Sequence, residues 1–323
     1  MKTQVVYTLI SSPNDVYLEQ LWLSVYSLKI YNKQAYVVVL TDASTYEYMI
    51  NIKELIKIID EIKIIDIPNN YNKIQKSRFL KTTIRQNIKG RFLFIDTDTI
   101  ITNNIEEIDD IKVQIACVPD IHTTFKKFPF REGVINITMK VFNVDVSDAQ
   151  YYFNSGVMLV EDSKITHNFY KSWHDNWKYS SFAKGVNTDQ QSLIKTDKDY
   201  NYIIEPLSGI YNCQLLGSIQ YLNEAKIMHF FNATWLPNTQ YNPFFGKEIY
   251  QQLKKEQRVT SLLEDKVRKC KSLFSSPSML VADEYFSFLL SGSTRAMYNL
   301  YCKKHICFKV IGFIIRGINK LFN

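Results

Sequence analysis

The sequence predicts an α/β fold in which a mostly parallel sheet is covered by helices on both faces. Short runs of almost entirely apolar residues alternate with stretches of helical periodicity through the first hundred residues. Strands buried on both faces of a parallel sheet have this continuous apolar pattern. Hydrophobic residues make up 46% of the 323 residues, so the chain can bury a full core.

The first half of the chain is predicted to alternate strands and helices. Ser12 followed by Pro13 is typical of a helix start, and Ser44 with Glu47 forms a capping-box pattern for the next helix. Leu18, Leu21, Val25 and Leu28 follow at helical spacing, as do Leu80, Ile84 and Ile88. The predicted strands are Gln4–Ile10, Tyr36–Leu40, Ile62–Ile67 and Arg91–Ile95.

The second half is less regular. Val134–Val144 and Val157–Val160 are predicted as strands, and Ser163–Tyr179 as a helix. From about Lys247 the chain becomes helical and basic. We therefore predict a main domain over residues 1–246 and a helical C-terminal extension over residues 247–323.

The net charge of +7 is concentrated near the C-terminus. Residues 286–323 contain six basic residues and no acid, whereas the rest of the chain is nearly balanced. This distribution does not predict a nucleic-acid surface along the whole molecule. Residues 304–323 have opposed apolar and basic faces at helical spacing, which is typical of a helix on an anionic membrane surface. The alternative is a helix that packs on the main domain.

The five cysteines show no CxxC pair and no zinc-ligand spacing. Such a set favours a reducing cytoplasm. Val5–Ile10 is too short for the apolar core of a signal peptide, and no run reaches the length of a membrane-spanning helix. We expect a cytoplasmic protein that associates peripherally with the inner face of the cell membrane.

Asp96 and Asp98 follow the predicted strand Arg91–Ile95 directly. In an extended chain the side chains of residues i and i+2 point the same way, and ligands bind beyond the carboxyl ends of parallel strands. Two carboxylates so close repel each other unless a cation lies between them. Hard oxygen ligands suit Mg²⁺ or Mn²⁺. The alternative is a loop with solvated acids or helix caps.

The segment Ile95–Thr99 resembles the DxD motif of nucleotide-sugar transferases with the GT-A fold. Three further segments, in matching order, resemble glycosyltransferase family 8 and its relatives: Tyr152–Leu159 resembles a strand with an Asn-Ser-Gly core, Thr188–Leu193 a helix start with Asp-Gln, and Met228–Phe231 a late histidine. The resemblance covers roughly Val5 to Pro237. It implies a GT-A catalytic domain, and it departs from the family where Phe230-Phe231 follow the histidine in place of Gly and Lys.

The resemblance also implies roles for individual residues. Asp96, Asp98 and His229 would bind the metal, and the imidazole favours Mn²⁺ over Mg²⁺. Asn154 and Asp189 would hydrogen-bond the donor sugar, and Gln190 would lie near the anomeric carbon, so Asp189 and Gln190 are the catalytic candidates. Thr8 stands where the family often has an acid at the end of its first strand. The donor-binding candidates are Thr8, Tyr17, Arg78, Lys81, Asp96, Thr97, Asn154 and Ser155.

By the same resemblance, the expected function is metal-dependent transfer of a sugar from a nucleotide-diphosphate donor, UDP-linked, to a glycan or glycolipid acceptor with retention of anomeric configuration. A role in bacterial surface polysaccharide synthesis follows by analogy. The segment Ile121–Val134 is the candidate acceptor loop. Two other classes stay open. A sugar-phosphate nucleotidyltransferase needs a Gly-rich loop after the first strand, and Leu9–Pro13 contains no Gly. A non-enzymatic sugar- or nucleotide-binding protein needs no metal set.

Overall fold

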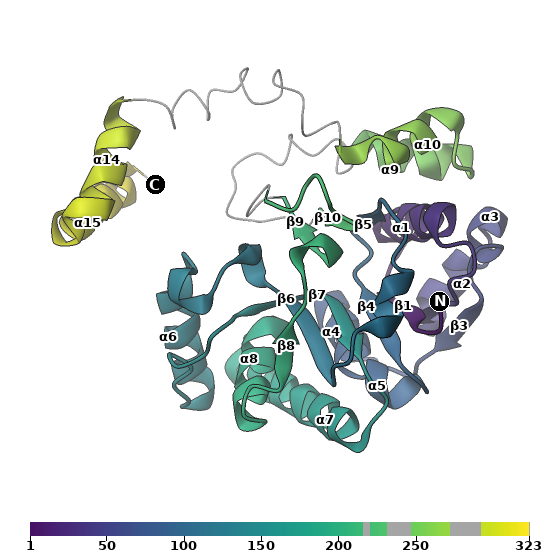
Figure 1. Cartoon of the computed structure of the whole chain (residues 1–323), viewed down its shortest axis with the longest axis horizontal. Coiled ribbons are helices and arrows are strands. Elements are labelled where there is room, and N and C mark those ends of the chain that lie inside the picture. The colour runs from purple at the N-terminus through teal and green to yellow at the C-terminus, as the bar shows by residue number, and fades with distance from the viewer. Residues whose placement is uncertain (216–219, 231–246, 272–291, 323) are drawn as a thin grey trace. The chain divides into compact units, whose positions relative to one another are not determined.

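The structure is a computed structural model that describes residues 1–215, 220–230, 247–271 and 292–322. The chain forms two compact units, residues 1–270 and residues 271–323. The first unit is an α/β domain built on a seven-stranded sheet with the order β3-β2-β1-β4-β7-β6-β8 (Figure 1). The strands are β1 (Gln4–Leu9), β2 (Val37–Thr41), β3 (Glu61–Ile64), β4 (Phe92–Ile95), β6 (Ile115–Pro119), β7 (Phe153–Val160) and β8 (Ile204–Pro206).

The sheet is parallel except for β7, which runs antiparallel to both β4 and β6. Strands β1, β2 and β4 are buried almost throughout, as their apolar runs predict. The predicted α/β class, with a mostly parallel sheet between helices, is confirmed. The carboxyl ends of β1, β4 and β6 lie at one edge of this sheet, where ligands bind in such folds.

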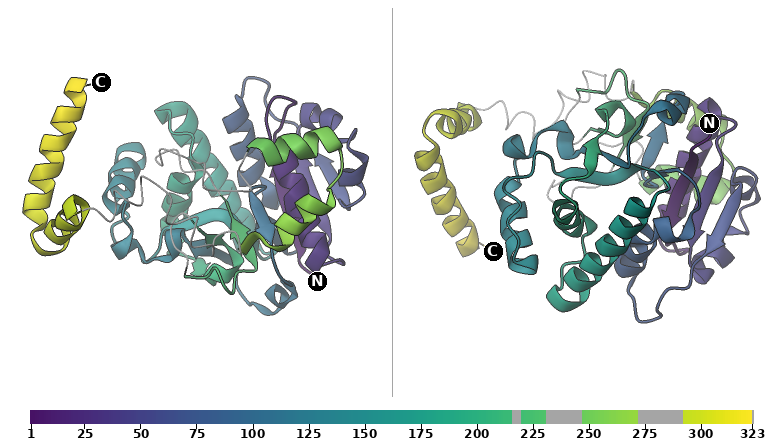
Figure 2. Two further views of the ribbon diagram at one scale, coloured as in Figure 1. Left: turned by 90° about the horizontal axis from the view of Figure 1, so that it is seen from above. Right: turned by 60° about the horizontal axis from the view of Figure 1, so that its bottom comes forward.

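Helices cover both faces of the sheet (Figure 2). Val6 and Phe94 point to one face and join a core with Leu80, Phe169 and Trp173. Alternate residues point to the other face, where Tyr7 hydrogen-bonds Ser24 of α1 at 3.1 Å. The helices of the first unit are α1 (Tyr17–Tyr31), α2 (Ala43–Met49), α3 (Lys53–Ile56), α4 (Lys73–Thr82), α5 (Ile84–Asn87), α6 (Arg131–Phe142), α7 (Lys164–Lys178), α8 (Asp189–Asp199), α9 (Lys247–Glu256) and α10 (Ser261–Arg268).

A second sheet of three strands continues the chain beyond β4. It has the order β5-β10-β9, made of β5 (Thr99–Ile101), β10 (Ile227–His229) and β9 (Cys213–Gln214). β5 and β10 are antiparallel, and their register places His229 opposite Thr99. The histidine is therefore one residue away from the Asp96–Asp98 turn, although it is far away in sequence.

One predicted strand is wrong. Val134–Val144 contains many β-branched residues, but residues 131–142 form helix α6. Its buried residues Val134, Thr138 and Val141 recur at helical spacing, and Thr138 bonds back to the carbonyl of Val134. Packing of this face against α8 and the segment around Phe125 outweighs β propensity. The helix ends at Asn143, which has a left-handed conformation.

Two predicted helix starts are also wrong. Ser12 is not an N-cap, because Asp15 accepts hydrogen bonds from Ser11, Ser12 and the backbone of Tyr17, and α1 begins only at Tyr17. The N-cap of α2 is Asp42 and not Ser44. The prediction for α7 is confirmed, since Ser163 caps it. Strand β3 ends at Ile64, three residues before the predicted end, as befits an edge strand.

The predicted boundary at residue 247 lies inside the first unit. Helices α9 and α10 both contact α1 or the loop before it. Lys254 of α9 donates to the carbonyl of Asp15 at 2.9 Å, and Tyr26 of α1 donates to Glu264 of α10 at 2.8 Å. The second unit contains α14 (Gly292–Lys303) and α15 (His305–Phe322). Among the described helices, none combines the length and the apolar character needed to span a membrane.

Candidate active site

A cavity of about 700 Å³ lies at the carboxyl ends of β1 and β4 and at the amino end of the antiparallel strand β7. Every residue that the sequence predicts for metal, donor or catalysis lines it: Thr8, Tyr17, Arg78, Lys81, Asp96, Thr97, Asp98, Asn154, Ser155, Asp189, Gln190 and His229. The structure thus brings these positions together, and their individual roles remain predictions. The volume of this cavity is in the range of small-molecule binding sites.

Two carboxylates and one imidazole converge at one end of the cavity. Ligand atoms of Asp96, Asp98 and His229 all lie within 4.8 Å of one another, and Nε2 of His229 is 3.1 Å from Oδ1 of Asp98. Burial is the largest single effect and disfavours the imidazolium, but the carboxylates of Asp98 and Asp96 together outweigh it and raise the pKa of His229. Two oxygen donors and one nitrogen donor suit a divalent cation such as Mn²⁺, so the residues present fit the predicted metal.

Gly156 makes room for this arrangement. Its carbonyl accepts a hydrogen bond from the backbone NH of Asp96 at 2.7 Å, which fixes the start of the acidic turn against β7. A Cβ at position 156 would lie 2.2 Å from Cε1 of His229 and 2.9 Å from Oδ1 of Asn154. Only a glycine allows the histidine ring and the strand to approach so closely.

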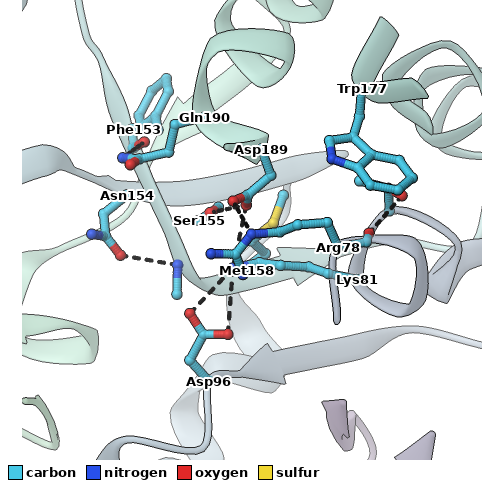
Figure 3. Close-up of polar contacts among 12 residues, drawn as sticks. Arg78, Lys81, Asp96, Phe153, Asn154, Ser155, Met158, Trp177, Asp189 and Gln190 are labelled. Carbon is cyan, nitrogen blue, oxygen red and sulfur yellow. Dashed lines mark hydrogen bonds and ion pairs between the residues drawn. The ribbon is translucent and has the colours of Figure 1, made fainter. Parts of the chain in front are cut away.

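Two cations from α4 pair with Asp96 and Asp189 (Figure 3). Lys81 lies between two carboxylates, with Nζ 3.1 Å from Oδ2 of Asp96 and 3.5 Å from Oδ2 of Asp189. Nε of Arg78 is 2.9 Å from Oδ1 of Asp189, and Ser155 donates to Oδ2 at 2.7 Å. Burial alone would raise the pKa of Asp189, but Arg78 and Lys81 hold it well below its usual range. Asp189 is therefore a fixed anion at the start of α8.

Asp120 is a cavity residue that sequence reasoning missed. Its Oδ2 accepts from Nε2 of Gln190 at 3.2 Å, and its Oδ1 from Nδ2 of Asn154 at 3.4 Å. Burial raises the pKa of Asp120, against these hydrogen bonds. A signal was present: an acid follows the apolar run Ile115–Val118, as Asp96 follows β4.

Asn212 is the second residue near the metal cluster that the sequence does not predict. It is completely buried, and its Oδ1 lies 2.9 Å from Nδ1 of His229. It follows a short 3-10 turn, Gly209–Tyr211, in a part of the chain without clear periodicity. Nothing in the sequence around it predicts this contact.

Two further groups of residues line the cavity. In the first, Nζ of Lys73 lies 4.6 Å from the ring centroid of Tyr17, and Thr8 is the last residue but one of β1. In the candidate acceptor loop, Ile121, Phe128 and Phe130 line the cavity. Ile121 has a left-handed backbone with φ of 46°. Strain of this kind in a β-branched residue clusters at functional sites.

No family model matches the chain, and no curated protein matches it. Among solved structures, the apo form of the glycosyltransferase GlyE of Streptococcus pneumoniae TIGR4 is similar, with a TM-score of 0.50 and 15% identity over 84% of this chain and 64% of GlyE. A second GlyE structure has a TM-score of 0.47 and 16% identity, and the match covers 73% of this chain and 57% of GlyE. The apo form of mouse xyloside xylosyltransferase 1 has a TM-score of 0.47 and 16% identity, and the match covers 70% of this chain and 97% of that protein's chain. The chain thus spans just under two thirds of GlyE and shares its GT-A-like α/β fold.

Proposed function

We propose that this chain is a metal-dependent glycosyltransferase, related to glycosyltransferase family 8. One observation carries the proposal: Asp96, Asp98 and His229 converge on a cavity that Asp189 and Gln190 also line, at the carboxyl edge of a GT-A-like sheet. Asp96 and Asp98 come from the end of β4, and His229 comes from β10, so the arrangement does not arise from local sequence alone.

The proposed donor is a nucleotide-diphosphate sugar, with UDP as the nucleotide. When bound, a Mn²⁺ or Mg²⁺ ion would stabilise the negative charge of the departing diphosphate as a Lewis acid. Arg78 faces the same cavity and supplies a second positive charge. We assign Thr8, Tyr17, Thr97, Asn154 and Ser155, which line the same cavity, to binding of the donor.

The proposed reaction retains the anomeric configuration by attack on the same face from which the diphosphate departs. Gln190 is an amide and cannot act as a carboxylate nucleophile. Asp189 is paired with Arg78 and Lys81 and accepts from Ser155, so its charge is stabilised and it is a poor nucleophile, while it can still accept a hydrogen bond from a sugar hydroxyl. We assign Asp189 and Gln190 to binding the donor sugar, and the departing phosphate oxygen to accepting the proton of the acceptor hydroxyl.

The proposed acceptor is a glycan or glycolipid of bacterial surface polysaccharide synthesis, held near the inner face of the cell membrane. The second unit supports this partner. Helix α15 exposes Ile306, Phe313 and Leu321 together with basic residues such as Lys309. Residues 286–323 carry no acid that would repel anionic lipid.

The test is a panel of nucleotide sugars incubated with the purified protein and Mn²⁺, with release of free nucleotide as the readout. We expect slow hydrolysis of one donor, stimulated by Mn²⁺ and abolished by EDTA. Donor binding without any turnover, with or without candidate acceptors, would instead indicate a non-enzymatic binding protein.

A further inference from the structure

A continuous series of hydrogen bonds joins the metal cluster to Gln190. Nδ1 of His229 meets Oδ1 of Asn212 at 2.9 Å, and Nδ2 of Asn212 donates to Oδ1 of Asn154 at 3.1 Å. Nδ2 of Asn154 donates to one oxygen of Asp120, and Nε2 of Gln190 donates to the other. The series links side chains from β10, the turn before β9, β7, the end of β6 and the start of α8.

The amide of Asn212 has its orientation fixed by its neighbours. Oδ1 of Asn154 already accepts the backbone NH of Gly156 at 2.9 Å, so it acts as an acceptor and faces the NH₂ group of Asn212. The carbonyl oxygen of Asn212 must then face His229. An acceptor at that position requires a proton on Nδ1 of His229. Nε2 is then the nitrogen that faces Oδ1 of Asp98. It donates to that carboxylate in the metal-free site, and it presents its lone pair when a cation displaces this proton.

We propose that Asn212 is a positioning residue: it fixes the tautomer and the ring orientation of His229 so that Nε2 presents its lone pair to a divalent cation held by Asp96 and Asp98. This inference rests on the proposed function. A metal-bound histidine almost always donates its second NH to an oxygen acceptor that sets its orientation. Asn212 is the acceptor at this place, and it is completely buried. Its other amide atom holds Asn154 at the edge of the same cavity.

The test compares Mn²⁺ affinity, measured by calorimetric titration without donor or acceptor, in the wild type and three variants. Asn212→Leu removes the acceptor, and we expect Mn²⁺ binding to weaken by about 10- to 100-fold. Asn212→Asp keeps an acceptor for Nδ1 and should bind Mn²⁺ within a few fold of the wild type. The matched control is Asn32→Leu. Asn32 is also buried and also takes part in two side-chain hydrogen bonds, with Asn103 and Ile105, but neither of these partners is a metal-ligand candidate or a cavity residue.

A purely structural role for Asn212 predicts a different pattern. Asn212→Leu and Asn32→Leu would then lower the melting temperature alike and leave Mn²⁺ affinity unchanged, which would overturn the inference. A wild type that binds no Mn²⁺ would overturn the proposed metal dependence as well. If Asn212→Leu does not fold, ¹⁵N spectra of the wild type with saturating Mg²⁺ decide. We expect His229, assigned by its absence in His229→Gln, to carry its proton on Nδ1; a proton on Nε2 would overturn the inference.

Discussion

The imidazole of His229 occupies the space in which a side chain at position 156 would stand. The distance from a Cβ at Gly156 to Cε1 of the ring would be 2.2 Å, far below any van der Waals contact. The Asn-Ser-Gly segment of β7 and the late histidine of β10 are therefore parts of one packing arrangement. The glycine is needed for the position of a metal-ligand candidate, and its own backbone angle is ordinary.

Gly156→Ala should weaken Mn²⁺ binding and transfer by at least 10-fold, because His229 must move away from Asp98. The matched control is Gly133→Ala in α6, where a Cβ meets nothing within 4 Å. Titration of activity against Mn²⁺ for both variants gives the answer. Equal Mn²⁺ dependence in both would show that the contact between Gly156 and His229 has no part in metal binding.

Lys81→Met should destabilise the protein by about 3–5 kcal/mol, the usual result of removing one partner from a buried ion pair. The side chain of Lys81 is 3% exposed, and its ammonium lies between Asp96 and Asp189. Lys57→Met is the control, since its pair with Glu54 is on the surface and contributes little. Urea unfolding of both variants measures the difference. Comparable midpoints for both would mean that the buried lysine does not offset the charges of the two acids.

Asp197→Asn should change the pH dependence of stability. Burial raises the pKa of Asp197 to about 7, above its unfolded value near 4. The folded state therefore holds a proton that the unfolded state loses, and the contribution of Asp197 to stability falls as pH rises from about 4 to about 7. The free energy of unfolding of the variant relative to the wild type should rise by roughly 1 kcal/mol per pH unit across this window. A difference that is flat from pH 4 to 8 would contradict the shift.

Removal of residues 304–323 should release the protein from anionic vesicles. Each basic residue near an anionic surface contributes about 1 kcal/mol, so Lys304, Lys309 and Arg316 make part of the binding salt-sensitive. Burial of the exposed apolar side chains of α15 adds a part that salt does not remove. Sedimentation with and without anionic lipid tests both parts. The membrane proposal fails if the intact protein stays in the supernatant.

Much of the fold was predictable, because buried parallel strands leave continuous apolar runs that a single sequence shows. β1, β2 and β4 were predicted within one or two residues of their ends. Helix α6 was not predicted, because the β-branched residues of Val134–Val144 are typical of a strand. Burial of the helical face formed by Val134, Thr138 and Val141 favours the helix instead. The predicted starts of two helices are wrong because an acid, Asp15 or Asp42, accepts the hydrogen bonds that were expected of a serine.

The candidate site, like the fold, is predictable from the sequence only in part. Residues that follow an apolar strand, such as Asp96, were visible in the sequence. The partnership of His229 with Asp98 depends on the register between β5 and β10, and only the family resemblance pointed to it. Asn212 lies on an irregular segment, and its contact with His229 depends on the pairing of β9 with β10. No local pattern encodes such a contact.

Asp98→Asn is the variant that probes the proposed metal site itself. The measurement is the rate of nucleotide release from the preferred donor at saturating Mn²⁺, with the melting temperature recorded on the same samples. We expect a loss of at least about 10²-fold in rate, with a melting temperature close to that of the wild type, because Asp98 stands at the cavity and not in the apolar core. The exposed Asp66→Asn should behave as the wild type. A near-normal rate for Asp98→Asn would contradict the metal site and the mechanism built on it.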